Sequence, residues 1–168
     1  MFKGNPIGLG GPEIKAGQDA PDFTAVDNGL QPVKFSASKG KVVILSAVPS
    51  LETPVCDMET RKFNEEAGKL GGNVEVWTIS MDLPFAQKRW CGAAGVTNVK
   101  TLSDFRDHSF SQNYGVMVKE GPLAGLTARA VFVVGKDGKI VYAEPKFNAL
   151  AQEGYDKLAA AIKQARAN

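Results

Sequence analysis

The feature that most constrains the fold is the segment 41–47, which reads KVVILSA. A continuous apolar run of this length, rich in β-branched residues, predicts a strand that is buried within a sheet. The segment 53–70 has a helical pattern, and Gly71 and Gly72 predict its end. A second run of strand type follows at 74–80 (VEVWTIS), so the middle of the chain is expected to form a strand–helix–strand unit.

The rest of the chain extends this unit into a layered α/β fold. Further elements are expected in the order helix 84–92, strand 101–103, strand 128–134, strand 139–142 and amphipathic helix 154–166. Asp137-Gly138 between two of these strands is a strong signal for a hairpin turn. The order β-α-β followed by β-β-α predicts a thioredoxin-like fold, in which helices flank a central mixed β-sheet.

Length and composition fit a single domain that spans residues 1–168. The 168 residues, of which 43% are hydrophobic, are enough to bury roughly 70% of the unfolded chain's surface on folding. Residues 1–16 contain closely spaced Gly and Pro, which predicts an N-terminal β-hairpin or a loose arm added to the domain. We find no linker, repeat or low-complexity segment in the sequence.

Charge and the scarcity of two residue types exclude several classes of function. A net charge of +2 gives no strong basic field, so nucleic acid is a poor candidate partner. Two cysteines and one histidine exclude a four-cysteine iron–sulfur cluster, and a zinc site would need all three residues and a carboxylate. The histidine, His108, lies in a polar stretch and is expected at the surface. The apolar runs are strand-sized and no apolar leader is evident, so we expect a cytoplasmic protein and no membrane association.

Cys56 lies where an open α/β sheet favours a reactive site. The segment 49–56 (PSLETPVC) follows the carboxyl end of the first buried strand, the edge at which such sheets bind ligands. Thr53 is suited to cap the next helix and Pro54 to begin it, which makes Cys56 the third helical residue. The positive end of the helix dipole favours the nucleophilic thiolate there. The alternative is a cysteine that only packs beneath the sheet, as many buried cysteines do.

The residues around Cys56 match a known active-site pattern. Pro49, Thr53 and Cys56 fit Pro-x-x-x-Thr-x-x-Cys, and the chain thereby resembles the peroxiredoxin family. The segment 48–56 is similar to that of the bacterial thiol peroxidases, which are atypical two-cysteine peroxiredoxins. Three later stretches share this similarity, namely 82–95 (DLPFAQKRWCGAAG), 102–106 (LSDFR) and 114–131 (YGVMVKEGPLAGLTARAV).

The resemblance implies a role for each matched residue. Cys56 would be the peroxidatic cysteine, which forms a sulfenic acid, and Cys91 would be the resolving cysteine. Pro49 would shield the sulfur from water, and Thr53 would hydrogen-bond both the thiolate and the peroxide. Arg129 would face the sulfur, stabilise the thiolate and donate to the peroxide oxygens. Judged on residue type alone, an ion pair between Arg129 and a carboxylate is an equal expectation.

Cys91 has two interpretations from the residues alone. It follows Lys88 and Arg89, two cations that favour a thiolate, but it is also placed as a helix cysteine that faces the core. As a resolving cysteine it would form an intramolecular disulfide with Cys56. A disulfide requires Cα atoms within about 7 Å, and the two cysteines lie on separate expected helices. We therefore expect local unwinding around Cys56 when the bond forms.

The resemblance thus implies a thiol-dependent peroxidase that serves in antioxidant defence. It would reduce hydrogen peroxide and organic hydroperoxides, the alkyl and lipid ones by preference, with thioredoxin as its reductant, no cofactor, and a homodimeric state. One alternative is a non-catalytic redox sensor that uses the same cysteine pair. Another is a thioredoxin-like disulfide oxidoreductase, whose Cys-x-x-Cys spacing is absent here. The segment 142–155 (YAEPKFNALAQEGY) departs from the family pattern, which leaves the docking of the last helix open.

Overall fold

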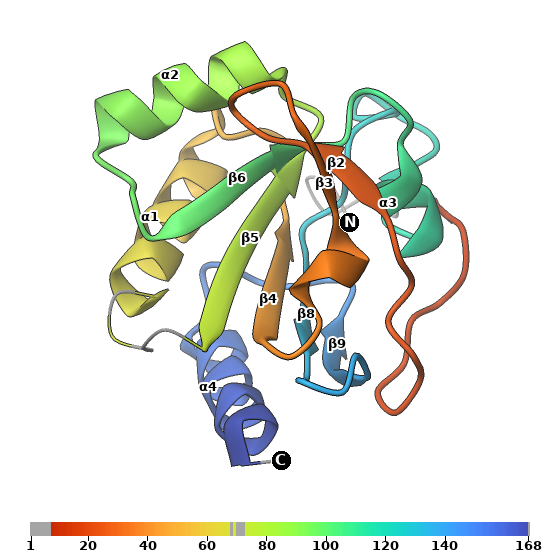
Figure 1. The fold of residues 1–168 in the computed structure, drawn as a ribbon. Coiled ribbons are helices and arrows are strands. Elements are labelled where there is room, and N and C mark those ends of the chain that lie inside the picture. The colour runs from red at the N-terminus through yellow and green to blue at the C-terminus, as the bar shows by residue number, and fades with distance from the viewer. Residues whose placement is uncertain (1–7, 68, 70–72, 168) are drawn as a thin grey trace.

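A mixed sheet of seven strands forms the centre of the molecule. The computed structural model describes residues 8–67, 69 and 73–167. The strand order across the sheet is β3-β2-β6-β5-β4-β8-β9, as can be followed in Figure 1. These strands are β2 (Thr24–Val26), β3 (Pro32–Lys34), β4 (Val42–Ala47), β5 (Val74–Ser80), β6 (Val99–Ser103), β8 (Ala130–Val134) and β9 (Ile140–Glu144). The three strands β4, β5 and β6 are parallel, whereas β8 pairs antiparallel with both β4 and β9.

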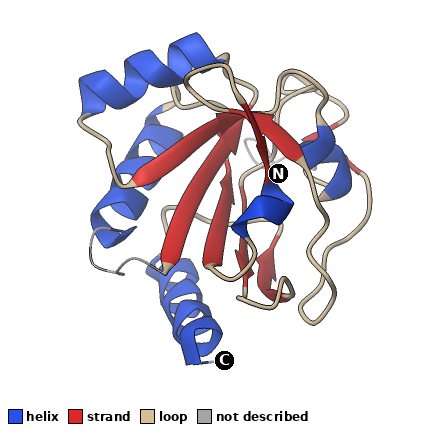
Figure 2. Cartoon of the chain, viewed as in Figure 1, coloured by secondary structure: helices blue, strands red, loops and turns tan. Residues whose placement is uncertain are grey.

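Both faces of the sheet are covered, which explains the continuous apolar run in β4. Val42 and Ile44 belong to the hydrophobic cluster on one face, and Val43 and Leu45 belong to the cluster on the other. Helices that contribute to the first cluster are α1 (Pro54–Ala67), α2 (Pro84–Ala94) and α4 (Gln152–Ala167). The second cluster is covered by α3 (Ser109–Asn113) and the short 3-10 helix η1 (Phe35–Ser38). Figure 2 shows this arrangement of helices around the strands.

The predicted elements of the central unit are present, with small shifts at their ends. The strand expected over 41–47 is β4, the strand over 74–80 is β5, and the helix over 53–70 is α1, which ends at Ala67. Gly71 and Gly72, which were expected to end it, lie outside the described residues. The hairpin of β8 and β9 is also confirmed, and Gly138 in its turn has a φ of 80°. The predicted α/β fold with a mixed sheet flanked by helices is therefore confirmed.

The N-terminal hairpin expected over 1–16 lies partly outside the described residues and stays a prediction. In the described residues, Leu9–Gly10 form strand β1, which pairs antiparallel with β7 (Met117–Val118) in a separate two-stranded sheet. Residues 1–7 lie outside the described part of the chain. Among the described residues, the hydrogen-bonding partner of this short strand comes from a distant segment of the chain.

The arrangement of β4 and β5 places two loops at one edge of the sheet. The strands are parallel, with Ala47 opposite Ile79, so both end at the same edge. The segment 48–53 leaves this edge toward α1, and the segment 81–83 leaves it toward α2. Across the residues that the structure describes, none of the helices has the length and apolar character that a bilayer span requires.

Candidate active site

The segment Pro49–Thr53 forms a tight turn between β4 and α1. The N–H and the side-chain hydroxyl of Thr53 both donate to the carbonyl oxygen of Ser50, at 3.2 and 2.9 Å respectively. The hydroxyl of Thr53 therefore closes the turn, where the sequence predicted that it would cap the helix. The helix begins at Pro54, which makes Cys56 its third residue, as predicted.

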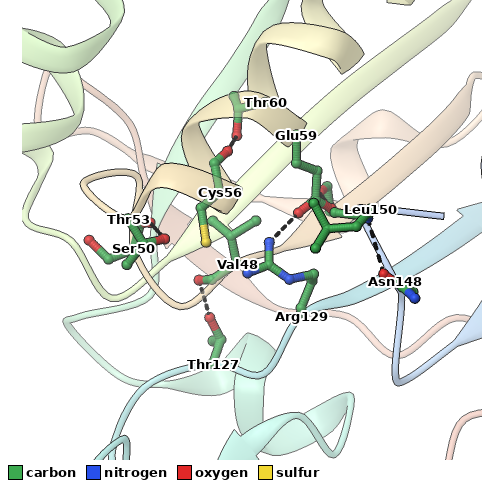
Figure 3. Close-up of polar contacts among 12 residues, drawn as sticks. Val48, Ser50, Thr53, Cys56, Glu59, Thr60, Thr127, Arg129, Asn148 and Leu150 are labelled. Atoms are coloured by element: carbon green, nitrogen blue, oxygen red, sulfur yellow. Dashed lines mark hydrogen bonds and ion pairs between the residues drawn. The ribbon is translucent and has the colours of Figure 1, made fainter. Parts of the chain in front are cut away.

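The side chain of Cys56 is enclosed by protein. Its exposed fraction is 0%, and it belongs to the core cluster on the α1 face of the sheet. Its main-chain carbonyl accepts a hydrogen bond of 2.8 Å from the hydroxyl of Thr60, one turn further along the helix. Cys56 and Cys91 are both free thiols. In Figure 3 the Cys56 sulfur points from the first turn of α1 toward the side of the site that holds Arg129.

Arg129 lies directly before β8, and its guanidinium forms an ion pair with Glu59. Its Nη1 donates to Oε2 of Glu59 at 2.6 Å, and Figure 3 shows the guanidinium on the side of the site toward which the Cys56 sulfur points. Burial lowers the pKa of Arg129, but the neighbouring Cys56 and Glu59 outweigh burial and raise the pKa above its ordinary value. Of the two sequence alternatives for Arg129, the ion pair with a carboxylate is present, and the role of Arg129 toward the Cys56 sulfur stays a prediction.

Glu59 is a buried carboxylate that the sequence analysis did not place in the site. Its exposed fraction is 0%, and in addition to Arg129 it accepts a long hydrogen bond of 3.5 Å from the hydroxyl of Ser46. Burial raises the pKa of Glu59 to about 7, although the charge and hydrogen bond of Arg129 act in the opposite direction. A signal for this residue exists in the sequence, because it follows Cys56 by three positions and so shares its side of the helix.

Asp82 stabilises the turn that contains Pro49 through hydrogen bonds. The sequence analysis did not identify Asp82 as a residue of the site. Its Oδ1 accepts a hydrogen bond from the hydroxyl of Ser50 at 2.6 Å. Its Oδ2 accepts the N–H of Leu51 and the hydroxyl of Ser80, both at 2.8 Å. Because β4 and β5 end at the same edge, residues that follow each strand meet there. Asp82 therefore connects the loop before α1 to the loop before α2.

A cavity of about 610 Å³ opens beside this site. Pro49 and Arg129 line it together with the segment 145–150, and its walls are mainly apolar. The N–H of Phe147 donates to the carbonyl oxygen of Arg129 at 3.1 Å, which ties this segment to the residue that carries the guanidinium. Leu150, 73% exposed, stands in the cavity wall, and Figure 3 shows it next to the ion pair of Arg129. The segment that departs from the family pattern thus shapes the surroundings of the site.

Cys91 lies on α2 and is half-buried. Its sulfur is 3.4 Å from the hydroxyl of Thr101 on β6, and its side chain packs partly against the core. Arg89, one of the two cations expected to favour a Cys91 thiolate, forms an ion pair with Glu52 at 2.9 Å, and Lys88 is exposed. These contacts fit a helix cysteine that faces the core better than a thiolate stabilised by Lys88 and Arg89.

The predicted site residues therefore fall into two groups. Cys56 and Arg129 lie on the same side of the site in Figure 3, and Pro49 and Thr53 lie in the turn that leads to the cysteine, whereas Cys91 lies on the neighbouring helix. His108 is half-buried at the start of α3 with a φ of 60°. Within residues 8–67, 69 and 73–167, we find no cluster of three or more His, Cys, Asp or Glu side chains suited to hold a metal ion.

Comparison with known families and sequences gives consistent matches over most of the chain. The Redoxin family model matches residues 15–158. The thiol peroxidase of Bacillus subtilis is 52% identical over 162 residues, which cover 96% of this chain and 95% of the relative. The thiol peroxidase of Staphylococcus aureus strain MRSA252 is 54% identical over 155 residues, which cover 92% of this chain and 88% of the relative.

Solved structures show the same similarity. The peroxiredoxin-like protein from Aquifex aeolicus superposes with a TM-score of 0.87 at 42% sequence identity, over 97% of this chain and 94% of that one. The thiol peroxidase from Chromobacterium violaceum superposes with a TM-score of 0.83 over 96% of this chain and 95% of that one. At 20% identity, this second match is evidence of a shared fold alone.

Proposed function

The chain belongs to the Redoxin family and is a thiol-dependent peroxidase of the peroxiredoxin type, and we propose that Cys56 is its peroxidatic cysteine. The observation that carries this proposal is the position of the Cys56 sulfur, in the first turn of α1 and on the side of the site that holds the Arg129 guanidinium. The helix dipole and the cation both favour the thiolate. A nucleophile that reacts as a thiolate needs no histidine as a general base.

In the proposed first step, the Cys56 thiolate attacks the terminal oxygen of a hydroperoxide in line with the O–O bond. An S–O bond forms as the O–O bond breaks. The sulfur is thereby oxidised to a sulfenic acid, and the leaving oxygen takes a proton from solvent to become water or an alcohol. Arg129 donates to the negative charge that develops on that oxygen, and Glu59 orients the guanidinium. Thr53 hydrogen-bonds the peroxide, and Pro49 shields the sulfur from water.

The proposed second step uses Cys91 as the resolving cysteine. Its sulfur attacks the sulfenic sulfur of Cys56, and an intramolecular disulfide and a water molecule result. An external dithiol then reduces this disulfide by thiol–disulfide exchange, and we propose thioredoxin for that role. The cycle consumes one hydroperoxide and one dithiol and requires no metal or organic cofactor.

The cavity beside the site supports alkyl and lipid hydroperoxides as preferred substrates, with hydrogen peroxide also accepted. Its volume of about 610 Å³ is far larger than hydrogen peroxide needs, and it opens next to Pro49 and Arg129. Apolar walls favour the binding of an alkyl chain, and the guanidinium at one side offers hydrogen bonds to the peroxide group. An organic hydroperoxide can therefore place its chain in the cavity while its O–O bond approaches Cys56.

We further propose that residues 1–168 act as one domain in the cytoplasm and form a homodimer around the active-site face. Leu83 and Phe85, at the start of α2, are 51% and 68% exposed, and exposed apolar side chains of this kind favour an interface. Size-exclusion chromatography with light scattering tests the dimer. A mass that stays monomeric at high protein concentration would contradict it.

Two cysteine variants test the catalytic assignment. With thioredoxin, thioredoxin reductase and NADPH, the wild type should consume peroxide continuously, and Cys56→Ser should consume none. Cys91→Ser should reduce one equivalent of peroxide, form a trappable sulfenic acid at Cys56, and then stop. Normal cycling of Cys91→Ser with thioredoxin would remove Cys91 from the resolving role. A wild type that forms the disulfide but shows no steady consumption would favour the redox-sensor alternative.

A further inference from the structure

Residues adjacent to the two cysteines bind each other across the helices. Asp57 follows Cys56 on α1, and Trp90 precedes Cys91 on α2. The indole N–H of Trp90 donates to Oδ1 of Asp57 at 2.8 Å, and only 7% of Trp90 is exposed. A partly buried hydrogen bond to a carboxylate therefore joins the two helices at the level of the cysteines.

Arg61 strengthens this connection. Its Nε donates to Oδ2 of Asp57 at 2.9 Å, so both oxygens of that carboxylate are engaged. Its Nη1 donates to the carbonyl oxygen of Ala94, at the end of α2, at 3.3 Å. Its guanidinium carbon lies 5.7 Å from the centre of the Trp90 ring. We call the group formed by Asp57, Arg61 and Trp90 the interhelix clasp.

The interhelix clasp is formed while the two cysteines are free thiols. Successive side chains on an α-helix point about 100° apart. Because Asp57 and Trp90 face each other, Cys56 and Cys91 are directed elsewhere. The Cys56 sulfur is buried in the core, and the Cys91 sulfur contacts the hydroxyl of Thr101 at 3.4 Å. The contact that joins the helices is thus also an obstacle to a disulfide between them.

We propose that the interhelix clasp sets how long the Cys56 sulfenic acid persists before Cys91 resolves it. The inference rests on the proposed function. In the resolving step, the Cys91 sulfur forms an S–S bond with the sulfenic sulfur, the S–O bond breaks, and the hydroxyl leaves as water with the thiol proton. The Cα atoms have to lie within about 7 Å, so the first turn of α1 unwinds and the bond between Trp90 and Asp57 breaks. Until then, a second hydroperoxide can oxidise the sulfenic acid to a sulfinic acid.

Asp57 stabilises the closed arrangement in two ways. It is the acidic residue in the first turn of α1, where a negative charge interacts favourably with the helix dipole. The same carboxylate accepts the hydrogen bond from α2. An ion pair also connects α2 to the turn before α1, between Arg89 and Glu52, but these side chains are 76% and 55% exposed, and ion pairs so exposed contribute little. Asp57 and Trp90 are therefore positioning residues for the resolving step.

The test compares Trp90→Phe with a matched control, Tyr114→Phe. Trp90→Phe keeps an aromatic ring but removes the donor to Asp57. Tyr114→Phe removes a hydrogen bond of the same length, 2.8 Å from the Tyr114 hydroxyl to the Pro21 carbonyl, within the other core cluster. After one equivalent of an alkyl hydroperoxide, alkylation and mass spectrometry follow disulfide formation over time. The same analysis, after repeated turnover with thioredoxin, gives the fraction of Cys56 converted to sulfinic acid per cycle.

We expect Trp90→Phe to form the disulfide about fivefold faster than the wild type, because the free energy of one net hydrogen bond corresponds to about that factor in rate. The amount of sulfinic acid formed per cycle should fall by a similar factor. Asp57→Asn retains an acceptor oxygen but loses the charge, so its rate should fall between those of wild type and Trp90→Phe. Tyr114→Phe should form disulfide and sulfinic acid in the same proportion as the wild type, even if its melting temperature falls.

Two outcomes would overturn the inference. One is a disulfide rate in both Trp90→Phe and Asp57→Asn that equals or falls below that of the wild type. The other is a shift in Tyr114→Phe as large as that in Trp90→Phe, which would show that general destabilisation controls resolution. Failure of the proposed function is distinguishable, because the wild type would then form no sulfenic acid at Cys56 and no disulfide with Cys91.

Discussion

The buried carboxylate of Glu59 should make the stability of the folded protein depend on pH. The substitution Glu59→Gln removes the ionisable group while it preserves the side-chain shape and an acceptor oxygen for Arg129. Glu59 is fully buried, and its oxygen lies 2.6 Å from Nη1 of Arg129, so the substitution acts at a well-defined contact. Any change in pH dependence can then be assigned to the titration of this one carboxyl group.

The magnitude follows from the pKa in the two states. Burial raises the pKa of Glu59 from 4.5 to about 7 in the folded protein, with Arg129 in partial opposition. The folded state therefore holds the proton more tightly than the unfolded chain. The contribution of this group to stability is fully present below pH 4.5 and is lost as the pH rises to about 7. At about 1.4 kcal/mol per pH unit, the loss across that window is about 3 kcal/mol.

Urea unfolding of the reduced proteins between about pH 5 and about pH 8 measures this effect. The free energy of unfolding of Glu59→Gln, relative to wild type, should increase by about 3 kcal/mol over that range. Other groups whose pKa is raised by burial, such as Asp104, are present in both proteins and cancel in the difference. A difference that does not change with pH would refute the argument, because Glu59 would then have the same pKa in both states.

The remaining predictions concern other residues of the site. Arg129→Ala should slow the reaction of Cys56 with peroxide by about 100- to 1000-fold, a typical effect of losing a donor to developing negative charge; an unchanged rate in competition kinetics would exclude Arg129 from the site. Asp82→Ala should free the turn at Ser50 and lower the free energy of unfolding by about 2–3 kcal/mol in urea titrations, whereas a loss below about 1 kcal/mol would show that the turn forms without it. Leu150→Asp should raise the KM for a bulky alkyl hydroperoxide about tenfold more than the KM for hydrogen peroxide, because it places a charge in an apolar wall. Equal effects on both substrates would show that alkyl chains do not bind there.

Much of the fold could be predicted because its central elements carry strong local signals. The run that forms β4 is largely apolar on both faces of the sheet, and β5 is rich in β-branched and aromatic residues, so each strand can be predicted without knowledge of its neighbours. The start of α1 is marked by Thr53 and Pro54. These signals placed Cys56 in the first turn of a helix at the carboxyl edge of the sheet, where the structure has it.

Elements that depend on distant partners could not be predicted in this way. The strand β1 has two residues, and its hydrogen bonds are made with β7, more than a hundred positions away in the sequence. The helix α3 has five residues and a polar sequence without helical periodicity. Its first turn is stabilised by Asp104, whose carboxylate accepts the N–H groups of Phe110 and Ser111 at 3.1 and 2.9 Å. Such contacts are determined by the assembled fold.

The site residues also divide into those that the local sequence predicts and those that depend on distant partners. Pro49, Thr53 and Cys56 occur in one short segment, so their proximity follows from the chain itself. Glu59 carries only a weak local signal, and nothing in the sequence around it indicates that Arg129, seventy positions later, will be its partner. Asp82 likewise acquires its role only because two parallel strands end at one edge of the sheet.

The charges around Cys56 define what the buried carboxylate of Glu59 does beside Arg129. When Cys56 and Glu59 are both ionised, one guanidinium faces two negative groups. During the reaction with peroxide, negative charge leaves the sulfur for the departing oxygen, and the sulfenic acid that remains is neutral. The pair of Arg129 and Glu59 is then left balanced. At the transition state the departing oxygen takes over negative charge from the sulfur, and Arg129 donates to that oxygen, so the contribution of ionised Glu59 is to keep the guanidinium oriented while the charge moves.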